Sequence, residues 1–182
     1  MDSGLKRRVV AFADRYNNAF LSGRFSHVER VRKYALLLAD KEGADKDVVE
    51  IAALFHDIGL TVDRDHHEEE SARLASAFLA KTDVPERERK MVIECILKHR
   101  SSKKTRTRLL EAKIVAAADA LAFLEDIRGL QRLFYRLHGE AEADIFDKIE
   151  RMYGKVTLPS AKPLTEPLYK KSMRYWKAKL QT

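Results

Sequence analysis

The stretch AALFHDIG, residues 52–59, places an imidazole beside a carboxylate where an apolar helix is about to end. Neighbouring residues on a helix point in different directions, yet His56 and Asp57 can both reach one ion beside the helix end. Asp57 is the only charged residue in the run 51–60, and a buried carboxylate needs a strong partner. Taken alone, the doublet favours a simpler interpretation, a helix that ends on a histidine and an exposed aspartate before glycine. The rest of the chain changes that interpretation.

The composition is typical of one globular domain, or of one domain with a C-terminal appendage, at 182 residues. No apolar run approaches the roughly 18 residues of a membrane span, and the first residues do not have the pattern expected of a signal segment. We therefore expect a cytoplasmic protein without a membrane partner. The single cysteine, Cys95, excludes an intramolecular disulfide and fits a reducing compartment. The net charge of +7 favours phosphates or polyanions as partners.

Apolar residues recur at helical spacing along most of the chain, and no alternating pattern typical of strands appears. Asp45 is the expected N-cap of the helix that ends at the His56-Asp57 doublet. Three prolines, at 159, 163 and 167, predict an irregular crossing before a last helix that carries Trp176. The sequence thus predicts an all-α fold. We expect residues 1–138 to form a helical domain and residues 139–182 to form a helical extension packed on it, which does not fold independently.

Further imidazoles and carboxylates fall at helix ends or on apolar helix faces. His27 lies in the first turn of a helix, His99 lies on an apolar face, and Asp119 lies in the apolar stripe of a helix from about Leu109 to Asp126. A single histidine in such a place is more often a core residue than a ligand. A buried carboxylate, however, costs several kcal/mol unless it is paired, and no Lys or Arg lies three or four residues from Asp119. Such groups arriving from five helices suit one divalent ion, or two ions bridged by a carboxylate.

The order His27 … His56-Asp57 … Asp119 resembles that of the HD superfamily of metal-dependent phosphohydrolases. The segments FSHVERV (25–31), AALFHDIGL (52–60) and KIVAAADAL (113–121) are similar to the three motif blocks of that family. The resemblance covers residues 20–130 and implies a compact helical HD-domain bundle whose central helices carry the ligands. His67 and His99 resemble the added ligands of the subset that holds two metals.

The sequence departs from several branches of the family. Arg100 stands where members with a paired His-His have a second imidazole. The Gly-Tyr-Pro signature of the cyclic-dinucleotide phosphodiesterases is missing. The Glu-Asp pair that the ppGpp hydrolases have between the His-Asp doublet and the last aspartate is missing as well. The resemblance therefore specifies the fold better than it specifies the substrate.

The resemblance also implies roles for individual residues. The first metal would be held by His27, His56, Asp57 and Asp119, and Asp57 would bridge to a second metal held by His67 and His99. His66, directly before His67, is an alternative ligand. The implied cofactor is one or two divalent ions of Fe, Mn, Zn, Co or Ni, with Mg also possible. Beside Asp57, the expected catalytic and phosphate-binding residues are Arg30, which is equally compatible with a solvated helix position, Arg100 and Arg128.

The function that follows is hydrolysis of a nucleotide or other small phosphate ester by metal-activated water. A nucleic-acid-binding or nuclease role is the first alternative, suggested by the basic balance and the basic stretch 98–108, but no aromatic-interleaved basic helix supports it. The second alternative is a regulatory domain without chemistry, although every ligand position is filled. The sequence leaves the substrate, the metal and the oligomeric state open.

Overall fold

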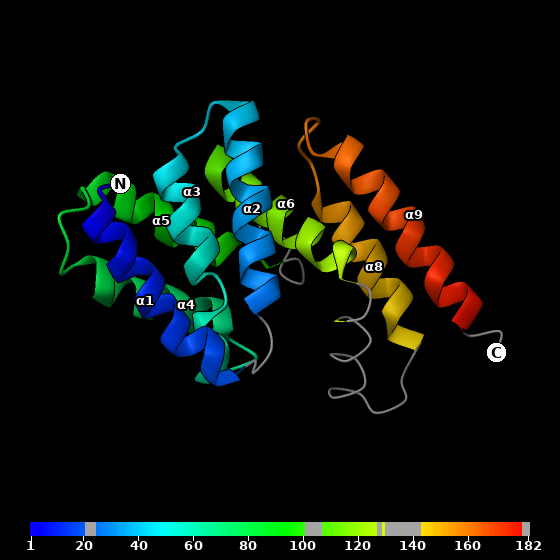
Figure 1. The fold of residues 1–182 in the computed structure, drawn as a ribbon, viewed down its shortest axis with the longest axis horizontal. Coiled ribbons are helices and arrows are strands. Elements are labelled where there is room, and N and C mark those ends of the chain that lie inside the picture. The colour runs from blue at the N-terminus through cyan, green and yellow to red at the C-terminus, as the bar shows by residue number, and fades with distance from the viewer. Residues whose placement is uncertain (21–24, 101–106, 127–128, 130–142, 180–182) are drawn as a thin grey trace.

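The computed structural model describes residues 1–20, 25–100, 107–126, 129 and 143–179. Within these residues the chain forms α-helices and one short 3-10 helix, and it contains no strand (Figure 1). The predicted all-α class is therefore confirmed. None of the described helices combines the length and the apolar character that crossing a bilayer requires.

The described elements follow one another along the chain as helices. They are α1 (Ser3–Phe20), α2 (Phe25–Glu42), α3 (Lys46–Phe55), the 3-10 helix η1 (Ile58–Thr61), α4 (His67–Leu79), α5 (Glu86–Lys98), α6 (Leu110–Glu125), α8 (Ala143–Lys155) and α9 (Lys162–Lys179). The helix expected from about Leu109 to Asp126 thus corresponds to α6. The boundary expected between residues 138 and 139 lies outside the described residues and stays a prediction.

Helix α6 is the centre of the bundle, because it packs against α2, α3, α5, α8 and α9 (Figure 1). Small side chains make this close approach possible. The fully buried residues of α6 are Ala112, Ile114, Val115, Ala117, Ala118, Ala120, Leu121, Ala122 and Leu124. A carboxylate at Asp119 therefore sits where several helices meet, rather than on an open surface.

Helix α3 is buried along almost its whole length and carries the His56-Asp57 doublet into the interior. The expected N-cap is confirmed, since the Asp45 carboxylate accepts hydrogen bonds from the backbone amides of Asp47 and Val48. The one charge in the middle of α3, Glu50, is compensated by Arg32, whose Nη2 lies 2.5 Å from Oε1. Because α3 is enclosed, the residues at its C-terminal end are enclosed with it.

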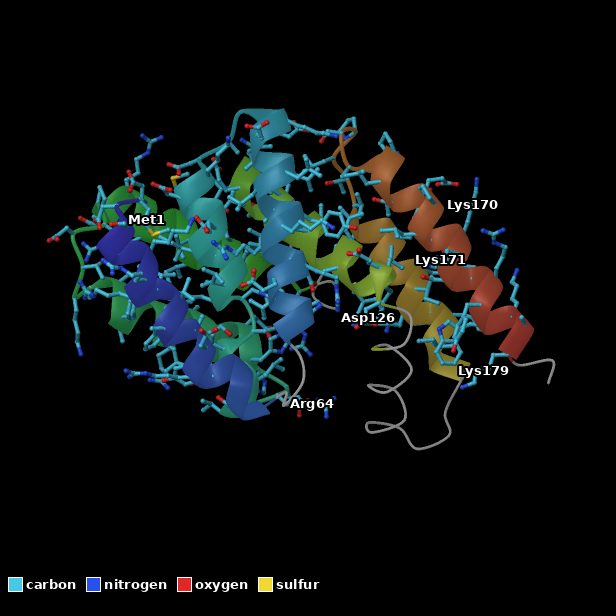
Figure 2. The ribbon with its side chains drawn as sticks, in the orientation of Figure 1. Met1, Arg64, Asp126, Lys170, Lys171 and Lys179 are labelled. Atoms are coloured by element: carbon cyan, nitrogen blue, oxygen red, sulfur yellow. The ribbon has the colours of Figure 1, made fainter. Side chains whose placement is uncertain are left out.

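The C-terminal helices pack on the outer side of α6. Ile145, Ile149 and Met152 of α8 are buried, and Ser172 of α9 donates a hydrogen bond of 3.1 Å to the Leu124 carbonyl. Figure 1 shows α8 between α6 and α9. Lys170 and Lys171 of α9, both labelled in Figure 2, are exposed. Both helices of the extension therefore pack against α6.

The sequence predicted an irregular crossing at three prolines. This prediction is wrong for Pro163 and Pro167, because both lie inside α9. Pro163 is the second residue of the helix, where the missing amide has no helical acceptor in any case. Pro167 removes one hydrogen bond to the Pro163 carbonyl, but both residues are exposed, so water reaches the unpaired carbonyl. The apolar anchors of α9 outweigh this local loss.

Gly59 is where the chain turns directly against the first turn of α4. The Gly59 amide donates a 2.8 Å hydrogen bond to Ser71 Oγ. A Cβ at Gly59 would press on the carbonyl oxygen of His67 and lie 2.5 Å from the backbone nitrogen of Ser71. Only glycine therefore lets the segment after Asp57 contact the helix that begins at His67.

We predict that Gly59→Ala lowers the free energy of unfolding by about 1–3 kcal/mol, because its methyl group meets backbone atoms that cannot move aside easily. The matched control is Gly154→Ala, an exposed position in α8 where a Cβ meets nothing within 4 Å. That variant should gain about 0.5–1 kcal/mol from reduced chain entropy. Urea denaturation followed by circular dichroism measures both, and equal stability of the two variants would contradict the close packing at Gly59.

Candidate metal centre

Five helices bring six imidazole and carboxylate side chains to one place in the interior. His27 comes from the first turn of α2, His67 from the start of α4, His99 from the end of α5 and Asp119 from the middle of α6. The doublet at residues 56 and 57 joins α3 to η1. The six residues that the sequence proposes as metal ligands therefore converge, although they span 93 positions of the chain from 27 to 119.

The first cluster is formed by His27, His56 and Asp119. Oδ1 of Asp119 lies 3.2 Å from Nε2 of His27 and 4.0 Å from Nε2 of His56. One potential ligand atom from each residue lies within 4.8 Å of the others. His56 is fully buried, whereas the His27 side chain keeps 13% exposure. The cluster is thus internal, with the side chains of His27 and Asp119 still partly exposed.

The second cluster is formed by Asp57, His67 and His99. Oδ1 of Asp57 lies 3.5 Å from Nε2 of His67 and 3.5 Å from Nε2 of His99. The other oxygen, Oδ2, lies 3.2 Å from Nε2 of His56 in the first cluster. Asp57 therefore presents one oxygen to each cluster, which is the arrangement of a bridging carboxylate.

Three of the histidines share one orientation, set by the helix ends at which they sit. In each, Nδ1 faces the carbonyl oxygen of the residue three positions earlier: 2.7 Å from His56 to Ala53, 3.0 Å from His67 to Arg64, and 2.5 Å from His99 to Ile96. A carbonyl oxygen can only accept, so Nδ1 carries the hydrogen. The lone pair is then on Nε2, and all three Nε2 atoms point toward the carboxylates. Ligating histidines are commonly held in this way.

This arrangement fits a metal ion better than it fits a closed hydrogen-bond network. Nε2 of His56 is buried and makes no hydrogen bond, although a carboxylate oxygen lies near it. A lone pair facing carboxylate oxygens is repulsive unless a proton or a cation lies between them. Imidazole nitrogens with carboxylate oxygens are a donor set that divalent transition metals accept. The described residues thus fit one ion in each cluster.

Charge coupling within the centre shifts the pKa values of its members. Burial opposes the charged form of His56, but the charges of Asp57 and Asp119 outweigh it and raise its pKa to about 9. Burial lowers the pKa of His99, and the neighbouring His56 charge adds to that effect. Burial also works against the Asp57 carboxylate, yet His56 and His99 hold its pKa well below the ordinary value. One proton on His56 therefore takes the place that a cation would occupy.

Lys155 is a member of the centre that the sequence reasoning missed. Its Nζ lies 2.6 Å from Oδ2 of Asp119, and its side chain is only 7% exposed. Burial disfavours the charge on Asp119, but Lys155 and His27 keep the pKa of this carboxyl well below its usual range. No spacing rule connects residues on two different helices. The only available signal is that Lys155 follows Met152, a buried residue of α8, by three positions.

The three arginines proposed to contact phosphate lie in different situations. Nη2 of Arg30 is 2.8 Å from Oδ2 of Asp126, at the end of α6 (Asp126 is labelled in Figure 2). Nη1 of Arg100 is 2.9 Å from Oε2 of Glu68 and also donates to the Asp65 carbonyl. Arg128 lies outside the described residues. Both described guanidinium groups thus already have carboxylate partners.

His66 and His67 differ sharply in position although they are neighbours. His66 is exposed, and its Nδ1 lies 3.2 Å from Oδ2 of Asp63. Of the two, only His67 faces Asp57. The structure therefore brings His67, and not His66, into the centre. The middle of the basic stretch 98–108, residues 101–106, lies outside the described residues.

Two solved structures share this fold. The crystal structure of Bacillus subtilis YpgQ in complex with ADP is 22% identical in sequence, has a TM-score of 0.70, and the match covers 94% of each chain. The Lin1889 protein from Listeria innocua is 21% identical with a TM-score of 0.69, and the match covers 98% of this chain and 95% of that one. Because the matches span nearly the whole chain, the shared fold includes the C-terminal helices.

The sequence also matches a family model, that of the HD domain, over residues 24–124. The matched segment contains all six converging imidazoles and carboxylates, and it ends before α8 and α9. The match covers more than half of the chain, and the His/Asp clusters fit the metal site of that family. The resemblance stated from the motifs is therefore confirmed, and this chain belongs to the HD domain family.

Proposed function

We propose that the protein is a metal-dependent phosphohydrolase that cleaves a nucleotide or another small phosphate ester. The observation that carries the proposal is the pair of clusters joined by Asp57, each with its histidine lone pairs turned inward. Members of the HD superfamily are metal-dependent phosphohydrolases, and the ligand positions of this chain are filled. That YpgQ, which shares the fold, was crystallised with ADP supports a nucleotide as the substrate class here.

The proposed cofactor is one divalent ion in each cluster, of Fe, Mn, Zn, Co or Ni, or of Mg. Such an ion supplies activated water at neutral pH and offsets the charge of a phosphate ester. Asp57, with one oxygen in each cluster, would hold both positions at a fixed separation. The hydrogen bonds from Nδ1 to the helix-end carbonyls keep the three rings from turning away. The protein contributes a site whose ligands are oriented in advance.

Removing Asp57 tests the centre as a whole. Asp57→Ala is expected to abolish hydrolysis of phosphate esters and to strip the metal, while the helical circular dichroism stays nearly unchanged. The control is Asp63→Ala, which removes a carboxylate near the surface whose side chain is 45% exposed. Metal content by atomic emission and a screen of nucleotides with Mn, Co, Ni, Mg and Fe measure the outcome. Full metal content in Asp57→Ala would show that the centre is assigned wrongly.

Metal binding should be coupled to a proton at His56. The pKa of His56 is raised to about 9 in the metal-free centre, so this imidazole is charged at pH 7.5 and must lose its proton to become a ligand. We expect release of about one proton per chain at pH 7.5, and an apparent affinity that rises about tenfold per pH unit until pH approaches 9. Calorimetric titration in two buffers of different ionisation enthalpy counts the protons. Binding without proton release would contradict the raised pKa.

The number of ions is tested by removing the second cluster alone. A His67→Ala, His99→Ala double variant should fall from about two ions per chain to about one, with most activity lost. His66→Ala is the matched control, because His66 is adjacent in sequence but exposed and outside the centre. Stoichiometry is measured after anaerobic loading with excess metal. A wild-type protein that never exceeds one ion per chain would exclude the second site.

A further inference from the structure

The side of α8 that faces α6 carries two lysines. Lys155 pairs with Asp119, and Nζ of Lys148 lies 5.0 Å from the centroid of the Phe123 ring, one helical turn further along α6. These two contacts show that α8 runs antiparallel to α6. Seven residues separate the lysines, which is about 10 Å along the helix axis and close to two full turns. They therefore form one row that begins at the metal centre and continues along α6.

Lys148 differs from Lys155 because no carboxylate of the described residues forms an ion pair with it. Its side chain is half-buried, and burial lowers its pKa, while the charges of Asp119 and Asp57 favour its charged form. The Phe123 ring offers the ammonium a favourable face, but a partly buried cation gains more from an anion. A cation in such a place, beside a site for phosphate chemistry, indicates an anionic ligand.

The charge balance of the centre leads to the same conclusion. In the metal-free protein, the carboxylates of Asp57 and Asp119 already lie near cationic groups, among them the ammonium groups of Lys148 and Lys155. Every divalent cation held by the two clusters adds net positive charge to the centre, even where it displaces a proton from a histidine. Lys155 in particular would share Asp119 with a cation. An incoming anion is the natural partner for this excess of charge.

We propose that Lys148 and Lys155 form a phosphate-binding row on α8, in which both ammonium groups bind phosphate oxygens of the substrate beside the metal centre. The proposal rests on the proposed function, since it concerns the substrate of the same site. It makes the C-terminal extension, which lies outside the segment matched by the HD family model, a part of the binding site.

Inorganic phosphate is the probe, because it carries the proposed recognition chemistry and is not hydrolysed. Calorimetric titration of the Mn²⁺-loaded full chain compares the wild type with Lys148→Met, which keeps the length of the side chain without its charge. A charge-assisted hydrogen bond to phosphate is worth enough to weaken binding about tenfold when it is lost. Lys148→Arg should retain most of the affinity. Metal stoichiometry should be the same in all variants, because Lys148 contacts no ligand.

The control is Lys171→Met, which removes one positive charge from an exposed position on α9 (labelled in Figure 2) and so changes the net charge equally. It should bind phosphate like the wild type, and in turnover assays Lys148→Met should raise KM about tenfold with kcat changed less than threefold. Phosphate affinity that is unchanged in Lys148→Met, or reduced equally in Lys171→Met, would overturn the proposal. A loaded wild type that binds no phosphate would overturn it as well. Loss of phosphate affinity in Lys148→Met alone supports the row even if no ester is hydrolysed, in which case only the proposed function fails.

Discussion

The burial of two carboxylates in the middle of a helical core is the constraint on which the rest of this structure depends. Asp57 and Asp119 lie among side chains that are almost entirely enclosed, where an unpaired charge would cost several kcal/mol. Neighbouring polar groups compensate these two negative charges. His56 takes a proton, Lys155 reaches in from another helix, and His27 contacts the outer edge of Asp119. The same charge density that is costly in the metal-free protein is what gives the centre its capacity for divalent cations.

Backbone carbonyls at or near helix ends orient three imidazole rings of this centre. At the ends of α3 and α5, and at the start of α4, a carbonyl three residues earlier fixes the hydrogen on Nδ1 of a histidine. The Ala53 and Ile96 carbonyls belong to the last turns of α3 and α5, where the regular helical acceptor pattern ends, and the Arg64 carbonyl belongs to the loop before α4. The local backbone thus supplies the outer hydrogen bonds that would otherwise need additional side chains. Gly59 also helps to form the centre, because the absence of a side chain there lets the start of α4 approach the His56-Asp57 doublet.

The C-terminal helices do more than pack on the outside of the bundle, because α8 places Lys155 against Asp119 in the metal centre. Helix α8 packs on α6 through Ile145, Ile149 and Met152, and this packing fixes where Lys148 and Lys155 lie. Helix α9 packs against both α6 and α8, and its residues Lys170 and Lys171 are exposed (Figure 2). The segment matched by the HD family model therefore contains the candidate metal ligands, whereas the side chain that neutralises Asp119 comes from outside it.

The sequence by itself determined the helical class, the N-cap at Asp45 and the six residues that converge, because helical periodicity and short motifs depend on neighbours along the chain. It misjudged Pro163 and Pro167, whose local preference was overridden by the packing of α9. Only the tertiary structure decided that His67 rather than His66 faces Asp57, and that Arg30 and Arg100 are bound by Asp126 and Glu68. It alone brought Lys155 to Asp119. The reason is physical: a contact between two helices depends on how their axes cross, and no spacing within either helix records that crossing.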